Sequence, residues 1–131
     1  MKAVKGKEIV FTGENKVGEL AEVAGAIKDR GINIRAISAW AVEGKAVFRL
    51  VTSDSIKTKE LLSAKGNVEE KEVIIAEMPD EVGQLQFLAS KLKDNNIDLA
   101  YIYGTTRELG KAAIIVFASD NNDKALEAIS A

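Results

Sequence analysis

The chain has 131 residues, of which 47% are hydrophobic and 29% charged, and its formal net charge is −2. This composition is typical of a globular protein with one domain or two small ones. The lack of a basic excess argues against nucleic acid as a partner, and no apolar run reaches the roughly 20 residues that span a bilayer. Residues 1–7 also lack the apolar segment of a signal peptide. We therefore expect a cytoplasmic protein without a membrane segment.

Neither cysteine nor histidine occurs in the chain. This excludes disulfides, thiolate metal sites and copper-chaperone chemistry. It also removes the commonest general base and transition-metal ligand. Carboxylates and lysines remain, so catalysis is disfavoured rather than excluded. We expect no cofactor and no metal.

The first half of the chain reads as strand, helix, two strands and a helix. Residues 8–13 are apolar and β-branched, which is typical of a strand. A helix is predicted from Val17 to Gly31, where the glycine suits a helix C-terminus. The later elements are strands at 34–41 and 46–52, joined at Gly44, and a helix at 56–64. Apolar residues recur at three-and-four spacing along the first helix, and we expect three of them to be core: Leu20, Val23 and Ile27.

The same pattern returns in the second half of the chain, 65 residues later. The matching pairs at this offset include Ile9 and Ile74, Val17 and Val82, Gly18 and Gly83, Leu20 and Leu85, Ile32 and Ile97, and Ile37 and Ile102. One inserted residue then aligns Gly44-Lys45-Ala46 with Gly110-Lys111-Ala112 and Ser53-Asp54 with Ser119-Asp120. The second copy therefore has a strand near 72–77, a helix at 82–94 ended by Asn95-Asn96, strands near 98–106 and 111–118, and a helix at 122–130.

The second copy ends directly after its last helix, so it lacks a fourth strand of its own. We predict that residues 2–13 and 67–78 form two long antiparallel strands, each lending its leading half to the other copy. The fold is then α+β, with two βαββαβ units side by side, predominantly antiparallel sheets and helices on one face. The units are 1–66, completed by 67–71, and 67–131, completed by 2–7. Units of about 65 residues gain stability from a shared sheet.

A glycine-bearing turn between strand and helix occurs in both copies, as Glu14–Leu20 and Pro79–Leu85. The backbone N–H groups of such a turn suit a small anion. Strand, turn, helix and the following segments Gly31–Ile34 and Asn96–Leu99 together resemble the ACT domain, over nearly the whole chain. The resemblance implies that each unit is ferredoxin-like. It also implies amino-acid binding at interfaces between domains and regulation of enzymes of amino-acid metabolism. It is similar in particular to small stand-alone proteins with two ACT domains.

Two asparagines carry the most specific part of this resemblance. Asn15 and Asn33 match the asparagines that hold serine in the regulatory domain of phosphoglycerate dehydrogenase, whereas a histidine of that site falls at Gly13. The family usually has proline before the glycine, where this chain has valine. The resemblance implies the following ligand-binding residues in the first copy: Asn15, Lys16, Val17, Gly18, Glu19, Leu20, Asn33 and Ile34. Their equivalents in the second copy are Asp80, Glu81, Val82, Gly83, Gln84, Leu85, Asp98 and Leu99.

Each of these residues also has a purely structural interpretation. Asn15 is equally well explained as a helix N-cap, and for Asp80 a cap is the preferred reading. Asp98 suits a ligand ammonium group. Tyr101 and Tyr103 should face the side of the sheet opposite to Ile102. Trp40 should lie at a strand end near an interface. Arg35 and Arg107 are candidate partners for a carboxylate.

The sequence thus predicts a non-catalytic amino-acid sensor that passes its signal to an enzyme partner in trans, most simply as a homodimer. The first copy is the favoured site because it has Asn15 where the second copy has Asp80, and a carboxylate at that position would repel the carboxylate of the ligand. One alternative is a small enzyme on a ferredoxin-like scaffold that uses carboxylate and lysine chemistry. Another is an RNA-binding module of the same topology, which the charge and the lack of stacking aromatic residues disfavour.

Overall fold

The computed structural model describes residues 1–106 and 112–130, and it confirms an α+β fold. Within these residues no helix is long and apolar enough to cross a membrane. The chain divides into two compact units, which we name the N-terminal unit, Lys7–Lys71, and the C-terminal unit, Met1–Gly6 with Glu72–Ala131. The elements are β1 (Lys2–Glu14), α1 (Glu19–Asp29), β2 (Ile34–Val42), β3 (Lys45–Thr52), α2 (Ser55–Ser63), β4 (Asn67–Pro79), α3 (Gln84–Asp94), β5 (Leu99–Thr106), β6 (Ala112–Ser119) and α4 (Asn122–Ser130).

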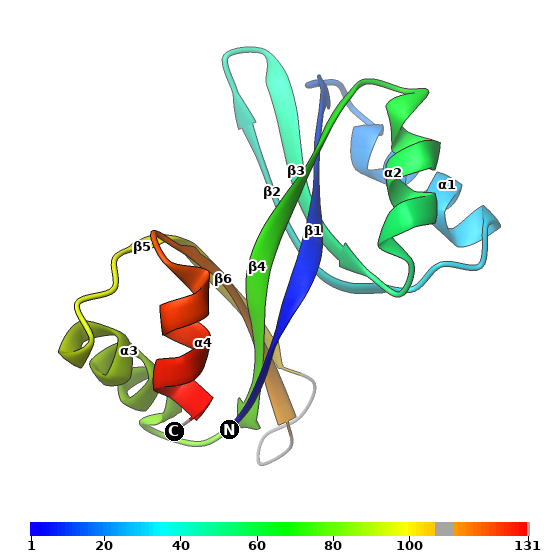
Figure 1. Cartoon of the computed structure of the whole chain (residues 1–131). Helices are drawn as coiled ribbons and strands as arrows, with labels where there is room; N and C mark the ends of the chain where they lie inside the picture. The colour runs from blue at the N-terminus through cyan, green and yellow to red at the C-terminus, as the bar shows by residue number, and fades with distance from the viewer. Residues whose placement is uncertain (107–111, 131) are drawn as a thin grey trace. The chain divides into compact units, whose positions relative to one another are not determined.

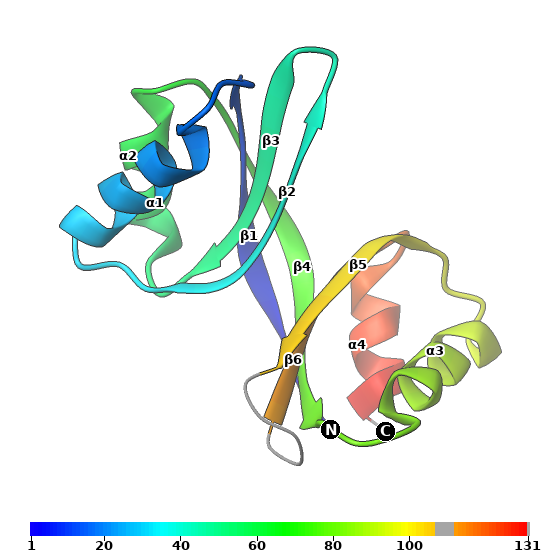
Figure 2. The same cartoon turned by 180° about the vertical axis from the view of Figure 1, so that it is seen from behind.

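The N-terminal unit has its strands in the order β2-β3-β1-β4, with α1 and α2 on one face of the sheet (Figures 1 and 2). Alternate residues of β1 and β3 face these helices, because side chains alternate between the two faces of a strand. Phe11 of β1 and Phe48 of β3 are paired in register, and their ring centroids lie 6.0 Å apart. The core of this unit consists of Ile9, Phe11, Val23, Ile27, Ile32, Ala46, Phe48, Leu50 and Leu62.

The C-terminal unit repeats this arrangement with the order β1-β4-β6-β5 and with α3 and α4 on one face. Its core consists of Ile74, Ala76, Met78, Leu88, Leu92, Ile97, Ala113, Phe117, Ala125 and Ile129. Both units are therefore ferredoxin-like, with a four-stranded antiparallel sheet and two helices. The long strands β1 and β4 each have residues in both units.

The leading halves of these long strands pack locally in the units to which they belong. Ala3 of β1 contacts the core of the C-terminal unit, and Val68 of β4 contacts the core of the N-terminal unit. Gly6 is packed so closely against Ile75 that a Cβ atom at Gly6 would lie 2.4 Å from the Ile75 Cδ1. We propose on this basis that each unit is completed by the leading half of the other copy's long strand.

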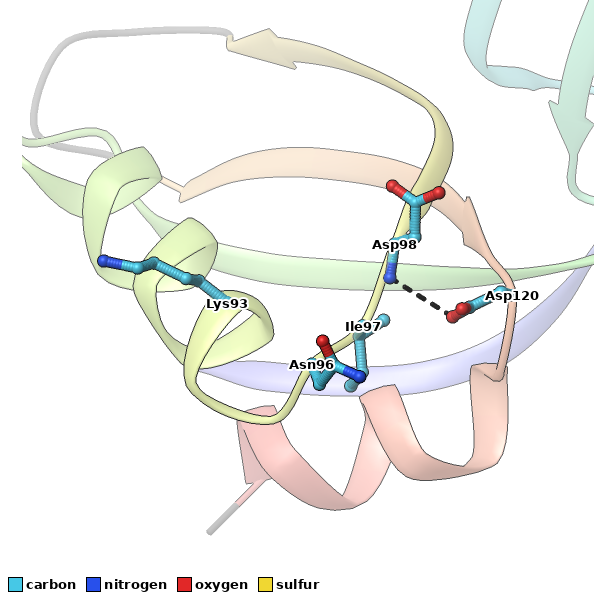
Figure 3. Close-up of a pocket in the computed structure, with 5 residues that line it drawn as sticks. All are labelled: Lys93, Asn96, Ile97, Asp98 and Asp120. Atoms are coloured by element: carbon cyan, nitrogen blue, oxygen red, sulfur yellow. Dashed lines mark hydrogen bonds between the residues drawn. The ribbon is translucent and has the colours of Figure 1, made fainter.

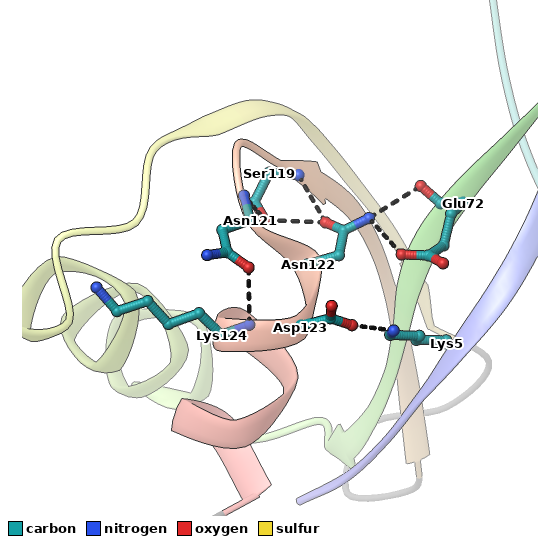
Figure 4. A network of polar contacts seen from close by, with 7 residues as sticks. All are labelled: Lys5, Glu72, Ser119, Asn121, Asn122, Asp123 and Lys124. Atoms are coloured by element: carbon teal, nitrogen blue, oxygen red, sulfur yellow. Dashed lines mark hydrogen bonds and ion pairs between the residues drawn. The ribbon is translucent and has the colours of Figure 1, made fainter.

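A network of polar contacts joins α4 to both strands in the C-terminal unit (Figure 4). The Asn122 side-chain amide donates to the Glu72 carbonyl at 3.0 Å, and its oxygen accepts from Ser119 N–H at 3.0 Å and from Ser119 Oγ at 2.8 Å. Lys5 of β1 pairs with Asp123 at the start of α4. The hydrogen bond to Asp123 raises the pKa of Lys5. The first turn of α4 therefore holds both long strands.

The strand register corrects the predicted alignment of the two copies. Leu50 pairs with Ile9, and Phe117 pairs with Ile74, so the third strands are 67 residues apart rather than 66. The segment from Thr106 to Ala113 in the second copy is longer than the equivalent segment from Ala41 to Ala46 by two residues, not by one. The strand register decides the alignment, because a shift of one residue would turn every side chain of β6 to the other face of the sheet. Ser53 is therefore equivalent to Asp120, and Asp54 to Asn121.

The predicted helix ends are confirmed. Gly31 has a φ of 70° and Asn96 a φ of 55°, so asparagine takes the left-handed conformation that glycine takes in the first copy. Ile32 N–H donates to the Ile27 carbonyl at 3.2 Å, and Ile97 N–H donates to the Leu92 carbonyl at 2.9 Å. Both first helices thus end in the same six-residue hydrogen-bonded turn.

Candidate ligand-binding site

The turn before α1 presents backbone N–H groups that have no partner in the part of the chain that the structure describes. Gly18 has a φ of 89° and occupies the N-cap position of α1, where no side chain forms a capping hydrogen bond. In the described residues, the turn's own bonds run from Glu19 N–H to the Lys16 carbonyl at 3.2 Å and from Glu22 N–H to the Gly18 carbonyl at 3.0 Å. This leaves four unpaired N–H groups, those of Val17, Gly18, Leu20 and Ala21. Such a set of donors at a helix N-terminus suits an anion.

The turn before α3 has the same geometry. Gly83 has a φ of 88°, and Phe87 N–H donates to its carbonyl at 3.0 Å. The equivalent unpaired N–H groups, within the part of the chain that the structure describes, belong to Val82, Gly83, Leu85 and Gln86. The two turns therefore differ in their side chains and not in their backbone.

Neither Asn15 nor Asp80 caps a helix, so that structural interpretation is wrong for both residues. The helices begin at Glu19 and Gln84, too far along the chain for these side chains to act as caps. Asn15 is exposed, and its backbone N–H donates to the Gly44 carbonyl at 3.1 Å. The Asp80 carboxylate instead accepts a hydrogen bond from the Thr106 hydroxyl at 2.9 Å.

Leu20 is not a core residue, in contrast to the prediction, whereas Val23 and Ile27 are buried as expected. The buried stripe of α1 runs through Glu19, Val23 and Ile27 at a spacing of four, and Leu20 lies one position away from it in the first turn of the helix. Leu20 is 55% exposed and its counterpart Leu85 is 57% exposed. Apolar side chains thus border both turns.

The charges at the first turn are arranged around Lys16. Its ammonium nitrogen lies 3.9 Å from Glu19 Oε2 and 3.4 Å from Glu22 Oε2. Glu19 is 8% exposed, and a Cβ atom at Gly13 would lie 3.4 Å from its Oε1. Glu19 thus lies against Gly13, the position to which the resemblance to the serine site aligns a histidine. In the second copy, Glu81 and Gln84 stand at the positions of Lys16 and Glu19, so that turn lacks a cation.

The structure does not bring Asn15 and Asn33 together within one unit. Asn15 precedes α1 and Asn33 follows it, and a helix of this length spans roughly 16 Å. Ile34 next to Asn33 begins β2, whereas Asn15 bonds to Gly44 at the far end of that strand. Asn33 is exposed; its N–H donates to Ser53 Oγ at 2.9 Å, and its carbonyl accepts from Ser53 N–H at 2.9 Å.

In the C-terminal unit, an open pocket of about 460 Å³ lies at the C-terminal end of α3 (Figure 3). The lining residues are Lys93, Asn96, Ile97, Asp98 and Asp120. Asp98 N–H donates to Asp120 Oδ1 at 3.2 Å, and Asp120 N–H donates to the Asp98 carbonyl at 3.0 Å. Of these lining residues, Asp98 was predicted from the sequence to bind a ligand, whereas Asp120 was not.

The remaining candidates lie on the sheets. Tyr101 and Tyr103 stack with ring centroids 6.5 Å apart and face away from Ile102, as predicted. Trp40 lies near the end of β2. The Cζ atom of Arg49 lies 5.6 Å from the centroid of the Trp40 ring. Arg49 also donates to the buried carboxylate of Glu8 at 2.7 Å, an ion pair that sequence reasoning missed. Arg35 is exposed, and Arg107 lies outside the described residues.

The described residues contain no group of three or more acidic side chains that could hold a metal ion. Two ferredoxin-like units, each with an open glycine turn before its first helix, define a paired α+β module. The sequence matches the family model of the ACT domain pair over residues 5–131, and the chain belongs to this family.

Comparison with solved structures agrees with this assignment at the level of the fold. Protein BT0572 from Bacteroides thetaiotaomicron superposes with a TM-score of 0.88 at 24% identity, covering 98% of this chain and 88% of that one. The ligand-free regulatory subunit of aspartate kinase from Thermus thermophilus gives a TM-score of 0.69 at 13% identity, with 99% and 95% covered. The aspartokinase α and β subunits give 0.65 at 18% identity, with 98% and 95% covered. No curated protein matches the sequence.

Proposed function

We propose that this chain is a non-catalytic, allosteric regulatory protein that binds an amino acid and acts on an enzyme of amino-acid metabolism in trans. The observation that carries the proposal is the open turn before α1, whose unpaired N–H groups lie beside Asn15, in a member of the ACT domain pair family. The similarity to an aspartate kinase regulatory subunit supports a partner of the same kind, an enzyme whose activity depends on the ligand.

The chemistry of the turn suits the carboxylate of an amino acid. Among the described residues, the N–H groups of Val17, Gly18, Leu20 and Ala21 have no acceptor. A negative charge at a helix N-terminus is stabilised by roughly 0.3–1 kcal/mol. The side-chain amide of Asn15 can add a hydrogen-bond donor or acceptor. A micromolar site needs about −8 kcal/mol in total. Further contacts, from Asn33 or its counterpart Asp98 and from apolar neighbours such as Leu20, are therefore part of the proposal.

The separation of Asn15 and Asn33 has a consequence for assembly. A free amino acid is much shorter than α1, so no single ligand can contact both asparagines of one unit. A turn and the start of β2 or β5 can therefore contact one ligand only when they come from different ACT units. We propose a homodimer as the assembly in which a second chain supplies such units.

The experiment is a thermal-shift screen of the full chain against the twenty amino acids. A ligand at one hundred times its Kd adds about 2.7 kcal/mol of stability, which corresponds to a Tm increase on the order of 10 °C for a chain of this size. Each amino acid that shifts the Tm is repeated as its N-acetyl and amide derivatives. Absence of a shift with all twenty contradicts the proposal.

A further inference from the structure

The internal repeat creates a pairing problem for this chain. In each unit a hairpin pairs with a long strand, the β2-β3 hairpin with β1 and the β5-β6 hairpin with β4. The corresponding elements have the same lengths in both copies: α1 and α3 have 11 residues, β3 and β6 have 8, and α2 and α4 have 9. Element length therefore does not determine which hairpin docks on which long strand.

The residues that face the helices do not determine the pairing either. In both units these paired residues are apolar: Ile9 with Leu50 and Phe11 with Phe48 in the N-terminal unit, and Ile74 with Phe117 and Ala76 with Ile115 in the C-terminal unit. Exchange of the two hairpins would therefore still place apolar residues opposite one another. Such misassembly, within one chain or between two copies, is a characteristic failure of repeat proteins.

The opposite face of the sheet distinguishes the two units. Arg49 pairs with Val10 across the strands, and its guanidinium group reaches the diagonal neighbour Glu8, with 2.7 Å between Arg49 Nη1 and Glu8 Oε1. The Glu8 side chain is fully buried, and the Arg49 side chain is 15% exposed. In the C-terminal unit the same two positions are Val73 and Val116, both fully buried. A charged pair in one unit thus corresponds to an apolar pair in the other.

Exchange of the hairpins would separate the two charges. Pairing of β3 with β4 would place Arg49 beside Val73, and pairing of β6 with β1 would place Val116 beside Glu8. A buried ion pair adds little stability over an apolar pair of similar size, but removing one partner of a buried pair is strongly unfavourable. Trp40, whose ring centroid lies 5.6 Å from Arg49 Cζ, is on the same hairpin as Arg49 and would move with it. The contact with Glu8, in contrast, exists only when β3 pairs with β1.

We propose that the Glu8–Arg49 pair is a selectivity device that directs the β2-β3 hairpin to β1 and keeps it from β4. The second copy needs no charged pair of its own, because one such pair makes both exchanged pairings unfavourable. The device follows from strand register and charge. It is independent of whether an amino acid binds, so the thermal-shift screen and the test below can fail separately.

The test uses engineered disulfides as reporters of strand pairing, because the natural chain has no cysteine. Thr12 pairs with Val47, and Glu77 pairs with Ile114 at the equivalent positions. Thr12→Cys with Val47→Cys therefore reports the natural pairing of β1 with β3, and Glu77→Cys with Val47→Cys reports pairing of β4 with β3. Each protein is unfolded in urea with reductant, refolded at low and at high concentration and then oxidised. The disulfides are quantified by mass spectrometry of proteolytic peptides.

Two sets of variants are compared with the natural background, in which the 12–47 disulfide is expected to form readily and the 47–77 disulfide to be rare. Glu8→Val with Arg49→Val gives both units a valine pair, and the 47–77 disulfide should rise roughly tenfold or more, most at high concentration. Adding Val73→Glu and Val116→Arg to this protein moves the charged pair to the C-terminal unit. The two units then differ again, so the 47–77 disulfide should become rare.

Three results overturn the inference. One is a 47–77 disulfide that is as frequent as the 12–47 disulfide in the natural background. Another is a 47–77 disulfide that stays as rare in the Glu8→Val, Arg49→Val protein as in the natural background, and this comparison decides the question even if the protein with the moved pair does not fold. The third is a folded protein with the moved pair in which the 47–77 disulfide remains frequent.

Discussion

Gly18 and Gly83 occupy equivalent turns with almost the same left-handed backbone, at φ values of 89° and 88°. A Cβ atom at either position would meet no atom within 4 Å. The glycines are therefore required by backbone conformation and not by close packing.

The first prediction follows from this geometry. Gly18→Ala and Gly83→Ala should each destabilise the chain by about 1–2 kcal/mol, the cost of a left-handed residue with a side chain. Gly25→Ala is the matched control, because Gly25 lies inside α1 with open space around it and should gain about 0.5–1 kcal/mol. Urea unfolding measures all three. An unchanged stability for Gly18→Ala would show that the turn adopts another conformation.

The second prediction concerns the buried ion pair of Glu8 and Arg49. The register places Val73 and Val116 at the equivalent positions of the C-terminal unit, both fully buried. Arg49→Val alone should cost about 3–5 kcal/mol, because it leaves Glu8 without this partner. The double variant with Glu8→Val reproduces the valine pair of the other unit and should recover most of that loss. A double-mutant cycle in urea checks this; additive losses would contradict it.

The third prediction concerns Asn122, which joins α4 to Glu72 (Figure 4). Asn122→Ala removes this bond and both bonds from Ser119, and should cost about 1–3 kcal/mol. Asn95→Ala is the control, since the Asn95 amide donates to the Lys91 carbonyl at 2.8 Å on an exposed helix surface and has no other bond among the described residues. Equal losses in the two variants would mean that the network contributes no more than one surface hydrogen bond.

The fourth prediction tests the proposed completion of each unit by the other copy's strand. Deletion of residues 1–6 removes Ala3 from the C-terminal core and Lys5 from Asp123. Amide hydrogen exchange should then accelerate in β4 and α4 more than in α1 and α2. Faster exchange confined to the residues next to the new N-terminus would contradict the proposed exchange of strands.

Much of the fold could be predicted because apolar periodicity, glycine turns and the repeat all indicated the same elements. Asn96 is an example, since its alignment with Gly31 predicted a left-handed helix end without any tertiary information. The length of the hairpin insertion could not be predicted from matching letters, because Ser53 aligns with Ser119 in sequence but with Asp120 in strand register.

The candidate site was less predictable for a physical reason. The motif identifies candidate residues by their order in the sequence, whereas ligand binding depends on which ends of the helices and strands lie close together in space. Asn15 and Asn33 are close in sequence but flank opposite ends of α1. Leu20 is exposed because Glu19, not Leu20, occupies the buried stripe with Val23 and Ile27 in the first turn of the helix. The Glu8–Arg49 pair depends on register between β1 and β3, which the sequence does not encode locally.

The central claim, that the turn before α1 binds an amino acid, is tested most directly by the Kd of the amino acid that raises the Tm most. Titration calorimetry on the natural chain and on Asn15→Ala is the measurement, with Asp80→Ala as the matched variant in the other turn. We predict that Asn15→Ala weakens binding roughly tenfold, the loss of one good polar contact, and that Asp80→Ala has a smaller effect. An unchanged Kd in Asn15→Ala, or no binding by the natural chain, would contradict the account.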